Sequence, residues 1–443
     1  MTLSIGIDAF NISMLKGSGV ATYGFNLNHS LRELGFETHL LYGPEQGPGK
    51  NALVNEMSLF DAPAPPSVSR YLASLIRDLK SVTSPLGRRA RPIPNSGAVV
   101  RRQVARRSPP CSVVWGSNNL FHGANRGYGT WGKFTPLNFD GAELPGPSVM
   151  HWTYPLPLRA PKRPNLYTIH DLVPIRLPYA TLDNKRRYYT LCQEICATAD
   201  GIVTVSQHSK RDMVDILKVD AKRITVTYQS VELPEAMIQR EDIEVAREIE
   251  GMFGLGWRGY FIFFGAIEPK KNLARLIEAY LGAGVDAPLV IIGGKAWLDD
   301  DQTELIYDDI VELSVIREGL VRRADRIRVY DYLPFSLLVS LIRGAKATLL
   351  PSLYEGFGLP VLESMLLGTP VLSSTEGSLP EVAGDAALLV DPYDPLAIRR
   401  GIVALDQDAD LRAELIRRGA LQAAKYSPAA YRMRLAELYQ PFG

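Results

Sequence analysis

Two carboxylates flank a glycine-rich turn in the stretch LYEGFGLPVLESML. Glu355 precedes the turn and Glu363 follows it, with seven residues between them. A pair of carboxylates could serve as the acid and the base of a hydrolase. However, an apolar strand is predicted to end at Pro351 and a helix to begin near Leu359, so the two acids would address different parts of one extended ligand.

The turn between the two acids is suited to a phosphate group. Gly356 and Gly358, with Phe357 between them, allow the backbone to approach a ligand closely. The free N–H groups of a helix that starts directly afterwards favour an anion such as a diphosphate. Glu363 would lie about one turn into that helix, where it can accept hydrogen bonds from a ribose diol. Glu355 is expected nearer the open cleft in front of the sheet.

A second polar loop, GAIEPKKN, follows a predicted strand that ends at Gly265. Lys270 and Lys271 come just before the helix LARLIEAYL, and Asn272 is its expected N-cap. A lysine beside a helix N-terminus makes a good anion site, because free N–H groups and a full positive charge combine there. Taken alone, the pair could equally be exposed lysines on a loop.

A third loop, SSTEGSLPEV, also follows a predicted strand. It carries Glu376, Gly377 and Glu381. The alternative interpretation for each is a turn with a capping acid. Because ligands of parallel sheets bind beyond the carboxyl ends of the strands, these three loops are the candidate site.

Apolar runs and helical patterns alternate along both halves of the chain. LSIGIDAF, a helical pattern and ETHLLYG indicate a βαβ opening, and the second half starts again with the strand YFIFFGAI. The sequence therefore predicts an α/β protein of two doubly wound, Rossmann-like domains that face one another across a cleft. We place the first domain at residues 1–230 and the second at 231–425. The last helix, in residues 426–443, either stays there or crosses back to the first domain.

Three histidines compete for the wall of that cleft. His151 and His170 end two short predicted strands, and His122 follows another. Asp171 comes directly after His170. The alternative for His170 and Asp171 is a structural pair, in which the acid orients the ring and caps a loop.

Composition argues against several classes of function. The formal net charge of +1 provides no field that would attract nucleic acid. Three cysteines without a pairing pattern favour a reducing, cytoplasmic compartment. The start, MTLSIGIDAF, lacks the pattern of a secretory signal, and no apolar stretch of about 18 residues predicts a transmembrane helix. Any membrane contact is therefore expected to be peripheral.

A basic segment interrupts the first half, within a predicted insertion at about 70–148. Residues 87–110 carry seven arginines and no acid. One interpretation is a solvated basic loop or helix. The other is that residues 88–107 contact anionic lipid at the inner membrane face, or a phosphorylated acceptor.

PSLYEGFGLPVLESMLLGTPV and SLPEVAGDAALLVDPYD resemble the donor half of the retaining glycosyltransferases of family 4, which have the GT-B fold. GAIEPKKNLARLIEAY resembles the diphosphate loop of that family. IGIDAFNISMLKGSGVATYGFNL, YTIHDLVPIRLP and TVSQHSKRDM resemble its first, acceptor-binding half. The resemblance spans most of the chain and is weakest between residues 43 and 148.

The resemblance implies roles in binding a nucleotide-sugar donor. Glu355 would contact hydroxyls of the donor sugar, Glu363 the ribose, and Lys271 the diphosphate. The other donor-binding residues that it implies are Gly17, Gly19, Gly265, Lys270, Gly356, Phe357, Gly358 and Leu359. In many relatives an arginine follows the glycine that ends the strand before the lysines, but here that residue is Ala266. Charge compensation would then rest on Lys271 and helix dipoles.

The resemblance also implies the groups around the reacting bond. The cleft histidine would be His151, with His122 as the alternative, and His170 and Asp171 would line the same cleft. The catalytic residues are thus expected to be these three together with Glu355 and Lys271.

The implied reaction is transfer of a hexose to an acceptor hydroxyl with retention at the anomeric carbon, by a front-face route in which the leaving phosphate helps to take the acceptor proton. GIDAF, TIHDLVPIRLP and IEPKKN are most similar to members that use GDP-mannose to build polysaccharides or O-antigens; UDP- and dTDP-linked sugars are alternatives. The acceptor would be lipid-linked or a saccharide.

Neither a cofactor nor a divalent metal is expected, because no Asp-x-Asp run follows a fitting strand and Asp299–Asp301 is interpreted as a solvated loop. Two further classes remain as alternatives. One is a nucleotide-sugar epimerase or phosphorylase on the same fold. The other is a non-catalytic subunit that binds sugar nucleotides.

Overall fold

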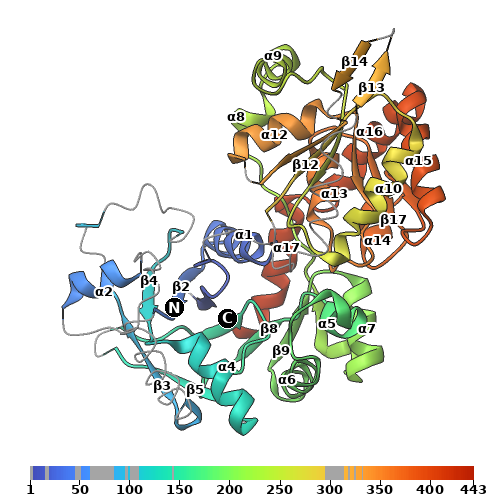
Figure 1. Cartoon of the computed structure of the whole chain (residues 1–443). Coiled ribbons are helices and arrows are strands. Elements are labelled where there is room, and N and C mark those ends of the chain that lie inside the picture. Colours follow the sequence, from blue (N-terminus) through green and yellow to red (C-terminus); the bar gives the residue numbers. More distant parts are fainter. Residues whose placement is uncertain are drawn as a thin grey trace, which may run out of the picture.

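The structure is a computed structural model, which describes residues 3–14, 19–44, 51–59, 84–94, 98–99, 109–141, 144–294, 314–317, 320–323, 326–331 and 333–443. Gly17, the basic residues 100–108 and the run Asp299–Asp301 lie outside the described residues. Two parallel sheets, each with its own helices, form two α/β units (Figure 1). No helix among the described residues has the length and apolar character needed to cross a membrane.

The first sheet is formed by ten strands in the order β10-β9-β8-β6-β1-β2-β4-β3-β5-β7. The strands are β1 (Ser4–Asp8), β2 (Glu37–Tyr42), β3 (Arg88–Pro92), β4 (Val113–Gly116), β5 (Thr135–Phe139), β6 (Val149–Trp152), β7 (Leu158–Arg159), β8 (Asn165–Thr168), β9 (Gly201–Thr204) and β10 (Ile224–Val226). Every pairing is parallel except that of β3 with β4. The strand order reverses direction between β1 and β6, as in a doubly wound fold.

The second sheet has six parallel strands in the order β15-β12-β11-β16-β17-β18. They are β11 (Phe261–Phe264), β12 (Leu289–Ile292), β15 (Ile327–Tyr330), β16 (Ala347–Leu350), β17 (Val371–Ser374) and β18 (Leu388–Val390). In chain order this is 3-2-1-4-5-6, the Rossmann order, with its switch point between β11 and β16. The segment FIFF of β11 is buried throughout, as expected for a strand covered on both faces. Strands β13 (Ser314–Arg317) and β14 (Leu320–Arg323) form a separate antiparallel hairpin.

The prediction of a basic loop or helix is wrong for the start of the arginine-rich segment. Arg88–Pro92 forms β3, which pairs with β4 on one side and β5 on the other. Arg89 and Arg91 remain exposed there and lie within 4.0 Å of Asp140. The described part of the segment is therefore held in the sheet, and lipid contact remains a prediction for which no described contact gives support.

Helices cover both sheets. In the first unit they are α1 (Gly19–Glu33), α2 (Ala52–Ser58), α4 (Leu120–Trp131), α5 (Val173–Arg176), α6 (Lys185–Thr198) and α7 (Gln207–Leu217). In the second they are α8 (Glu235–Ile238), α9 (Asp242–Phe253), α10 (Leu273–Ala283), α12 (Phe335–Gly344), α13 (Leu359–Leu366), α14 (Leu379–Ala383), α15 (Pro395–Gln407) and α16 (Ala409–Ala424).

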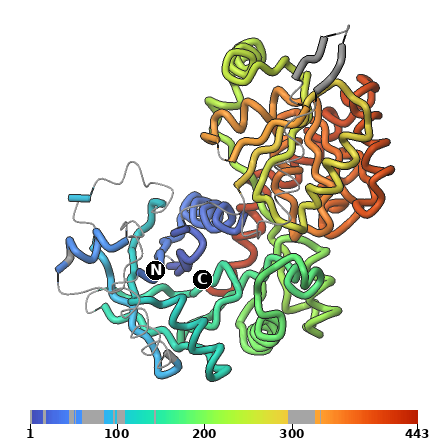
Figure 2. Tube along the Cα trace, in the orientation of Figure 1, coloured from blue at the N-terminus to red at the C-terminus, as the bar shows by residue number. Residues whose placement is uncertain are grey.

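The last helix, α17 (Pro428–Tyr439), returns to the first unit. It packs against α1, and Tyr431 and Tyr439 are fully buried. Figure 2 shows the red end of the chain reaching the blue and green body formed by the first half. Of the two alternatives for the last helix, the structure shows the return to the first unit. The chain therefore passes between the two units twice.

The two units also meet through α7 and the loops of the second sheet. The carboxylate of Glu381, on α14, accepts hydrogen bonds from the backbone N–H groups of Gln207 and His208 at 2.8 and 3.0 Å. Ser209 Oγ donates to the carbonyl of Gly356, and Tyr354 donates to the buried Asp212. Glu381 is therefore a capping acid, but for a helix of the other unit.

Replacing Glu381 by glutamine is expected to loosen the contact between the units. The substitution removes a full negative charge from two free N–H groups at a helix start, an interaction worth about 1–2 kcal/mol. We expect a lower thermal midpoint and a larger radius of gyration by small-angle X-ray scattering. Glu437→Gln, at an exposed position on α17, is the control. An unchanged radius and midpoint would show that the cap does not hold the units together.

Candidate functional site

The candidate site lies at the switch point of the second sheet. Lys270 and Lys271 follow β11 in a short 3₁₀ turn, and Glu355 follows the neighbouring strand β16. Asn272 joins the two loops, because its amide donates to the carbonyl of Pro351 at 3.0 Å. The expected side-chain N-cap at Asn272 is not observed, since this residue has a positive φ of 62° and makes no capping bond.

Glu355 lies at the centre of a buried cluster of charges. Lys271 Nζ is 2.5 Å from Glu355 Oε1, and Ser352 Oγ donates to the same oxygen at 3.0 Å. Lys270 Nζ is 4.0 Å from the other oxygen. Burial alone would raise the pKa of Glu355, but the two lysines outweigh it and lower this pKa. The carboxylate is therefore ionised at neutral pH.

This placement corrects one expectation for Glu355. Its side chain is not open to solvent, because Glu355 is 6% exposed and Lys271 is 7% exposed. The third loop closes over it: Ser378 donates to the carbonyl of Glu355 through both N–H and Oγ, at 3.1 and 2.8 Å. A side chain at Gly377 would have its Cβ 2.8 Å from that carbonyl oxygen. A ligand hydroxyl that bound to Glu355 would have to displace the contact with Lys271 or share the carboxylate with it.

Lys270 carries its charge between two acids. Its Nζ lies 3.4 Å from Glu268 Oε2 as well as 4.0 Å from Glu355 Oε2. Burial tends to lower the pKa of Lys270, but Glu355, Glu268 and Asp171 raise it well above its ordinary value. Ala266 is exposed. Lys270 is thus a second cation close to the one predicted for the diphosphate.

Glu363 lies on α13, half-buried, about one turn after the glycine turn. Burial raises its pKa to about 7, and Lys271 opposes this shift. In the folded protein the carboxyl group therefore holds its proton more tightly than in the unfolded chain. The free energy of unfolding consequently falls as the pH rises from 4.5 to about 7.

Nucleotide binding is expected to depend on the same proton. If Glu363 accepts hydrogen bonds from a ribose diol, binding favours the ionised form, so affinity for GDP should fall about tenfold between pH 8 and pH 6. The measurement is a titration of GDP by calorimetry at a series of pH values. Glu363→Gln should bind more weakly at pH 8 and lose this part of the dependence, while phosphate titration remains in both proteins. Equal slopes in the two proteins would contradict the ribose assignment.

The glycine turn packs against the first unit. A Cβ at Gly356 would lie 2.7 Å from Asp171 Oδ2 and 3.0 Å from the carbonyl oxygen of His170. Gly358 has a φ of 97°, a conformation that favours glycine. A Cβ at Gly19, the first residue of α1, would be 3.6 Å from Leu359. The start of α13 therefore lies beside two loops of the first unit, as a ligand shared by both units requires.

His170 and Asp171 form the wall that faces this turn. His170 is 9% exposed and its Nε2 donates to the carbonyl of Thr153 at 2.8 Å, so Nδ1 is the nitrogen that remains to accept a proton. Burial, the largest effect, lowers the pKa of His170. Tyr23 packs edge-on against the ring at 4.8 Å. A neutral, oriented imidazole thus lies next to the loop that carries Glu355.

His151 does not take the predicted place in the cleft. It is fully buried inside β6, where Nε2 bonds with Thr168 Oγ1 at 2.7 Å and Nδ1 bonds with the hydroxyl of Tyr439. Burial lowers its pKa to about 3. With both ring nitrogens engaged, His151 ties β6 to the returning helix α17. The expectation that it faces the substrate is therefore wrong, because it precedes the strand's end by one residue and its side chain points into the core.

The other histidines lie on other elements. His122 is exposed on α4, the helix that follows β4, and its assignment as the cleft histidine stays a prediction. His29 lies 3.1 Å from Glu232 on the surface. His39 is buried and accepts from Trp115 at 3.1 Å. His208 packs against Tyr354, and its backbone N–H donates to Glu381.

Sequence reasoning missed two acids near the site. Asp8, at the end of β1, is fully buried and accepts a hydrogen bond from the N–H of Thr153, beside the carbonyl that holds His170. Burial raises its pKa to about 6. Glu268 holds Lys270. Asp8 could have been found from its position, because it is the last residue of an apolar strand at the switch point of the first sheet.

Comparisons with known families match both units. The model described as "Glycosyltransferase Family 4" matches residues 17–234, and that described as "Glycosyl transferases group 1" matches residues 256–422. These two ranges correspond to the first and the second sheet with their helices.

Individual relatives are similar to more than half of the chain. It is 34% identical over 265 residues to O-antigen chain mannosyltransferase B of Escherichia coli, covering 59% of this chain and 66% of the relative. It is 29% identical over 276 residues to D-inositol 3-phosphate glycosyltransferase of Acidothermus cellulolyticus, covering 59% and 58%. The matched region thus spans less than two thirds of the length of each relative.

Solved structures show the same fold. Sucrose-phosphate synthase from Thermosynechococcus elongatus has a TM-score of 0.64 at 15% identity and covers 99% of both chains. HepE of Anabaena, in complex with UDP and glucose, has a TM-score of 0.62 at 14% identity over the full length of both. These likenesses show the GT-B fold. The two family models together match most of the chain, which therefore belongs to the glycosyltransferases of family 4.

Proposed function

We propose that this protein is a retaining mannosyltransferase that moves mannose from GDP-mannose to an acceptor hydroxyl in the synthesis of a polysaccharide, an O-antigen or a glycolipid. The observation that carries the proposal is the cluster at the switch point. There Lys270, Lys271 and Glu355 meet His170 and Asp171 of the other unit. The choice of mannose is supported by the names of relatives, several of which are O-antigen mannosyltransferases.

The cations of the cluster suit a leaving diphosphate. As the bond between the anomeric carbon and the phosphate oxygen breaks, negative charge grows on the nucleotide. Lys271, Lys270 and the start of α13 offer positive charge that is already in place, which is the main electrostatic means of catalysis. Glu355 would then be released from Lys271 and would accept hydrogen bonds from hydroxyl groups of the sugar.

The front-face route conserves the stereochemistry without a protein nucleophile. The acceptor oxygen bonds to the anomeric carbon on the side from which GDP departs, and the acceptor proton passes to the leaving phosphate. Glu355 is unsuited to be a nucleophile, because it is buried and its oxygens are held by Lys271 and Ser352. His170 Nδ1 would accept a hydrogen bond from a sugar hydroxyl close to this bond, since Nε2 donates to the carbonyl of Thr153.

A panel of nucleotide sugars tests the donor. A donor at about 100 times its Kd stabilises the fold by about 2.7 kcal/mol, which raises the thermal midpoint by several degrees. GDP-mannose should give the largest shift, and nucleotide release with a retained anomeric configuration, read by NMR, should follow with acceptor. A larger shift with UDP- or dTDP-sugars would contradict the mannosyl assignment. Binding without any nucleotide release would favour a non-catalytic subunit.

We also expect transfer without a divalent metal. In the part of the chain that the structure describes, no group of three or more His, Cys, Asp or Glu side chains is arranged to hold a metal. The lysines are proposed to supply the charge instead. Transfer should therefore keep its rate within about twofold in excess EDTA, a difference that corresponds to only about 0.4 kcal/mol. Activity lost with the chelator and restored by manganese would contradict this proposal.

A further inference from the structure

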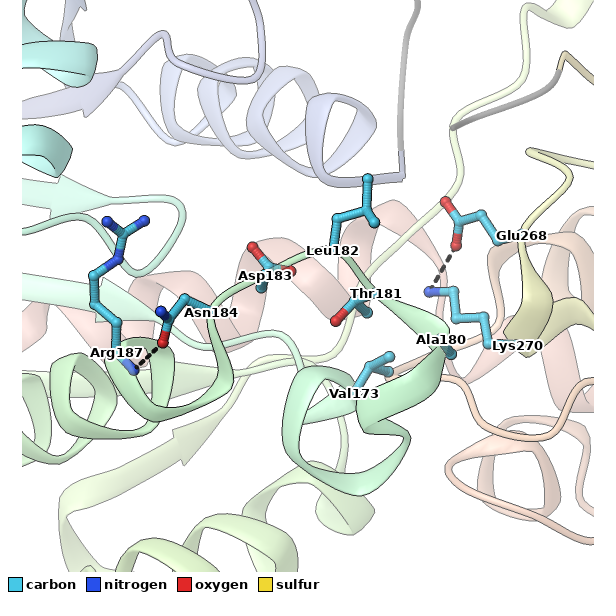
Figure 3. Close-up of a pocket in the computed structure, with 9 residues that line it drawn as sticks. All are labelled: Val173, Ala180, Thr181, Leu182, Asp183, Asn184, Arg187, Glu268 and Lys270. Carbon is cyan, nitrogen blue, oxygen red and sulfur yellow. Dashed lines mark hydrogen bonds and ion pairs between the residues drawn. The ribbon is translucent and has the colours of Figure 1, made fainter. Parts of the chain in front are cut away.

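A cavity of about 480 Å³ lies beside the charge cluster, between the two units (Figure 3). Its first wall is the segment between α5 and α6, with the start of α6. Its second wall is the lysine loop after β11. The lining residues are Val173, Ala180, Thr181, Leu182, Asp183, Asn184, Arg187, Glu268 and Lys270. The volume falls in the range of roughly 300–1,000 Å³ that holds small molecules in proteins.

Lys270 connects this cavity to the donor site. It lines the cavity, and its Nζ lies between Glu268 at 3.4 Å and Glu355 at 4.0 Å. The first wall is tied to the other side of the site, because Tyr188 on α6 donates to the carbonyl of Asp171 at 3.1 Å. A molecule in the cavity would therefore lie next to the group that receives the donor sugar.

The charges of the lining favour a neutral ligand. Asp183 and Glu268 balance Arg187 and Lys270, and Figure 3 shows Asp183 and Glu268 on opposite walls. Lys270 is already compensated by two carboxylates. A phosphate here would lie close to the carboxylates of Asp183 and Glu268, which would repel it.

The helix start at the cavity does not provide an anion site either. The side-chain oxygen of Asn184 accepts from the N–H of Arg187 at 3.0 Å, so this end of α6 is already capped. Sugar hydroxyls, in contrast, can donate to carboxylates and accept from lysine and amide groups. Leu182, which is 75% exposed, offers apolar surface for the C–H face of a sugar ring.

We propose that this cavity binds the terminal residue of a neutral saccharide acceptor, with Asp183 and Glu268 accepting hydrogen bonds from its hydroxyl groups. The assignment rests on the proposed glycosyl transfer, and it names the acceptor class: an uncharged sugar, not a phosphorylated one. The enzyme would thereby differ in acceptor chemistry from relatives named for D-inositol 3-phosphate, to which it is also similar.

The test is calorimetric titration of the full chain, saturated with GDP, with two probes: methyl α-mannobioside and inositol 3-phosphate. We expect the disaccharide to bind more tightly than the phosphate to the unmodified protein. Asp183→Asn should weaken the disaccharide about tenfold, as expected for one hydrogen bond to a charged group. Asp183 is exposed, so folding should be retained, and Asp410→Asn, exposed on α16, is the matched control.

Three results would overturn the assignment: no disaccharide binding, tighter binding of inositol 3-phosphate, or equal loss in the Asp183 and Asp410 variants. Nucleotide release from GDP-mannose, measured on the same protein preparations without added GDP, separates this inference from the proposed function. Disaccharide binding that depends on Asp183 without any nucleotide release supports the cavity and contradicts mannosyl transfer. Nucleotide release with disaccharide binding that is insensitive to Asp183→Asn contradicts the cavity alone.

Discussion

Replacing Lys271 by methionine is expected to lower the rate of transfer about 10²–10³-fold, because it removes a preorganised cation from the leaving diphosphate. The same change leaves Glu355 buried beside a more distant Lys270. An uncompensated buried charge lowers the free energy of unfolding by about 3–5 kcal/mol. Because Lys270 remains nearby, we expect a loss at the lower end, about 3 kcal/mol. Nucleotide release and urea unfolding measure the two effects.

A second substitution separates charge from fold. In the double variant Lys271→Met with Glu355→Gln, the buried acid is neutral, so most of the lost stability should return while activity stays lost. Lys346→Met is the control, since Lys346 pairs with Asp406 at 2.7 Å and lies outside the site. If the double variant regained transfer, Lys271 would act only by compensating Glu355 and not on the nucleotide.

Replacing His170 by alanine is expected to reduce transfer about 10²–10³-fold, while GDP binding changes little. The ring holds one backbone hydrogen bond and lies at the edge of the site. Its contribution should therefore appear in the chemical step, as a fall in kcat with acceptor present.

His151 provides the matching comparison. Its replacement by alanine leaves the hydroxyls of Thr168 and Tyr439 without their partner in the core, so stability should fall by about 2–3 kcal/mol. At a temperature where the variant is folded, kcat should remain close to that of the unmodified protein. A fall in kcat for His151→Ala, with His170→Ala unaffected, would reverse the assignment of the two histidines.

The local chemistry of the second half could be predicted from sequence because its signals are short in range. A buried strand, a glycine turn and a helix start around Leu359 follow one another within the same stretch, and α13 begins at that residue. The lysine loop and the glutamates likewise follow strands that the apolar pattern marks. Since parallel strands end at one edge of the sheet, their joining at one site followed from the pattern.

Pairings across long distances in sequence could not be predicted. Whether Glu355 faces solvent or Lys271 depends on how closely two loops pack, 84 residues apart in the chain. The assignment of His151 failed for a related reason. Near the end of a strand, a shift of one position decides whether a side chain lies in the core or in the cleft. The alternating pattern of so short a strand does not show at which residue the strand ends.

The sequence by itself determined that this chain forms two parallel α/β units, with two lysines and two glutamates at strand ends of the second. The reason is that strand burial, turn conformation and helix starts are local properties of the residues. Only the tertiary structure decided that His151 is buried in the core, that Glu381 caps a helix of the other unit, and that a balanced set of charges lines the cavity beside Lys270. These three features depend on contacts between segments that are far apart in the sequence. Such contacts form when helices and sheets pack together, so no single stretch of sequence predicts them.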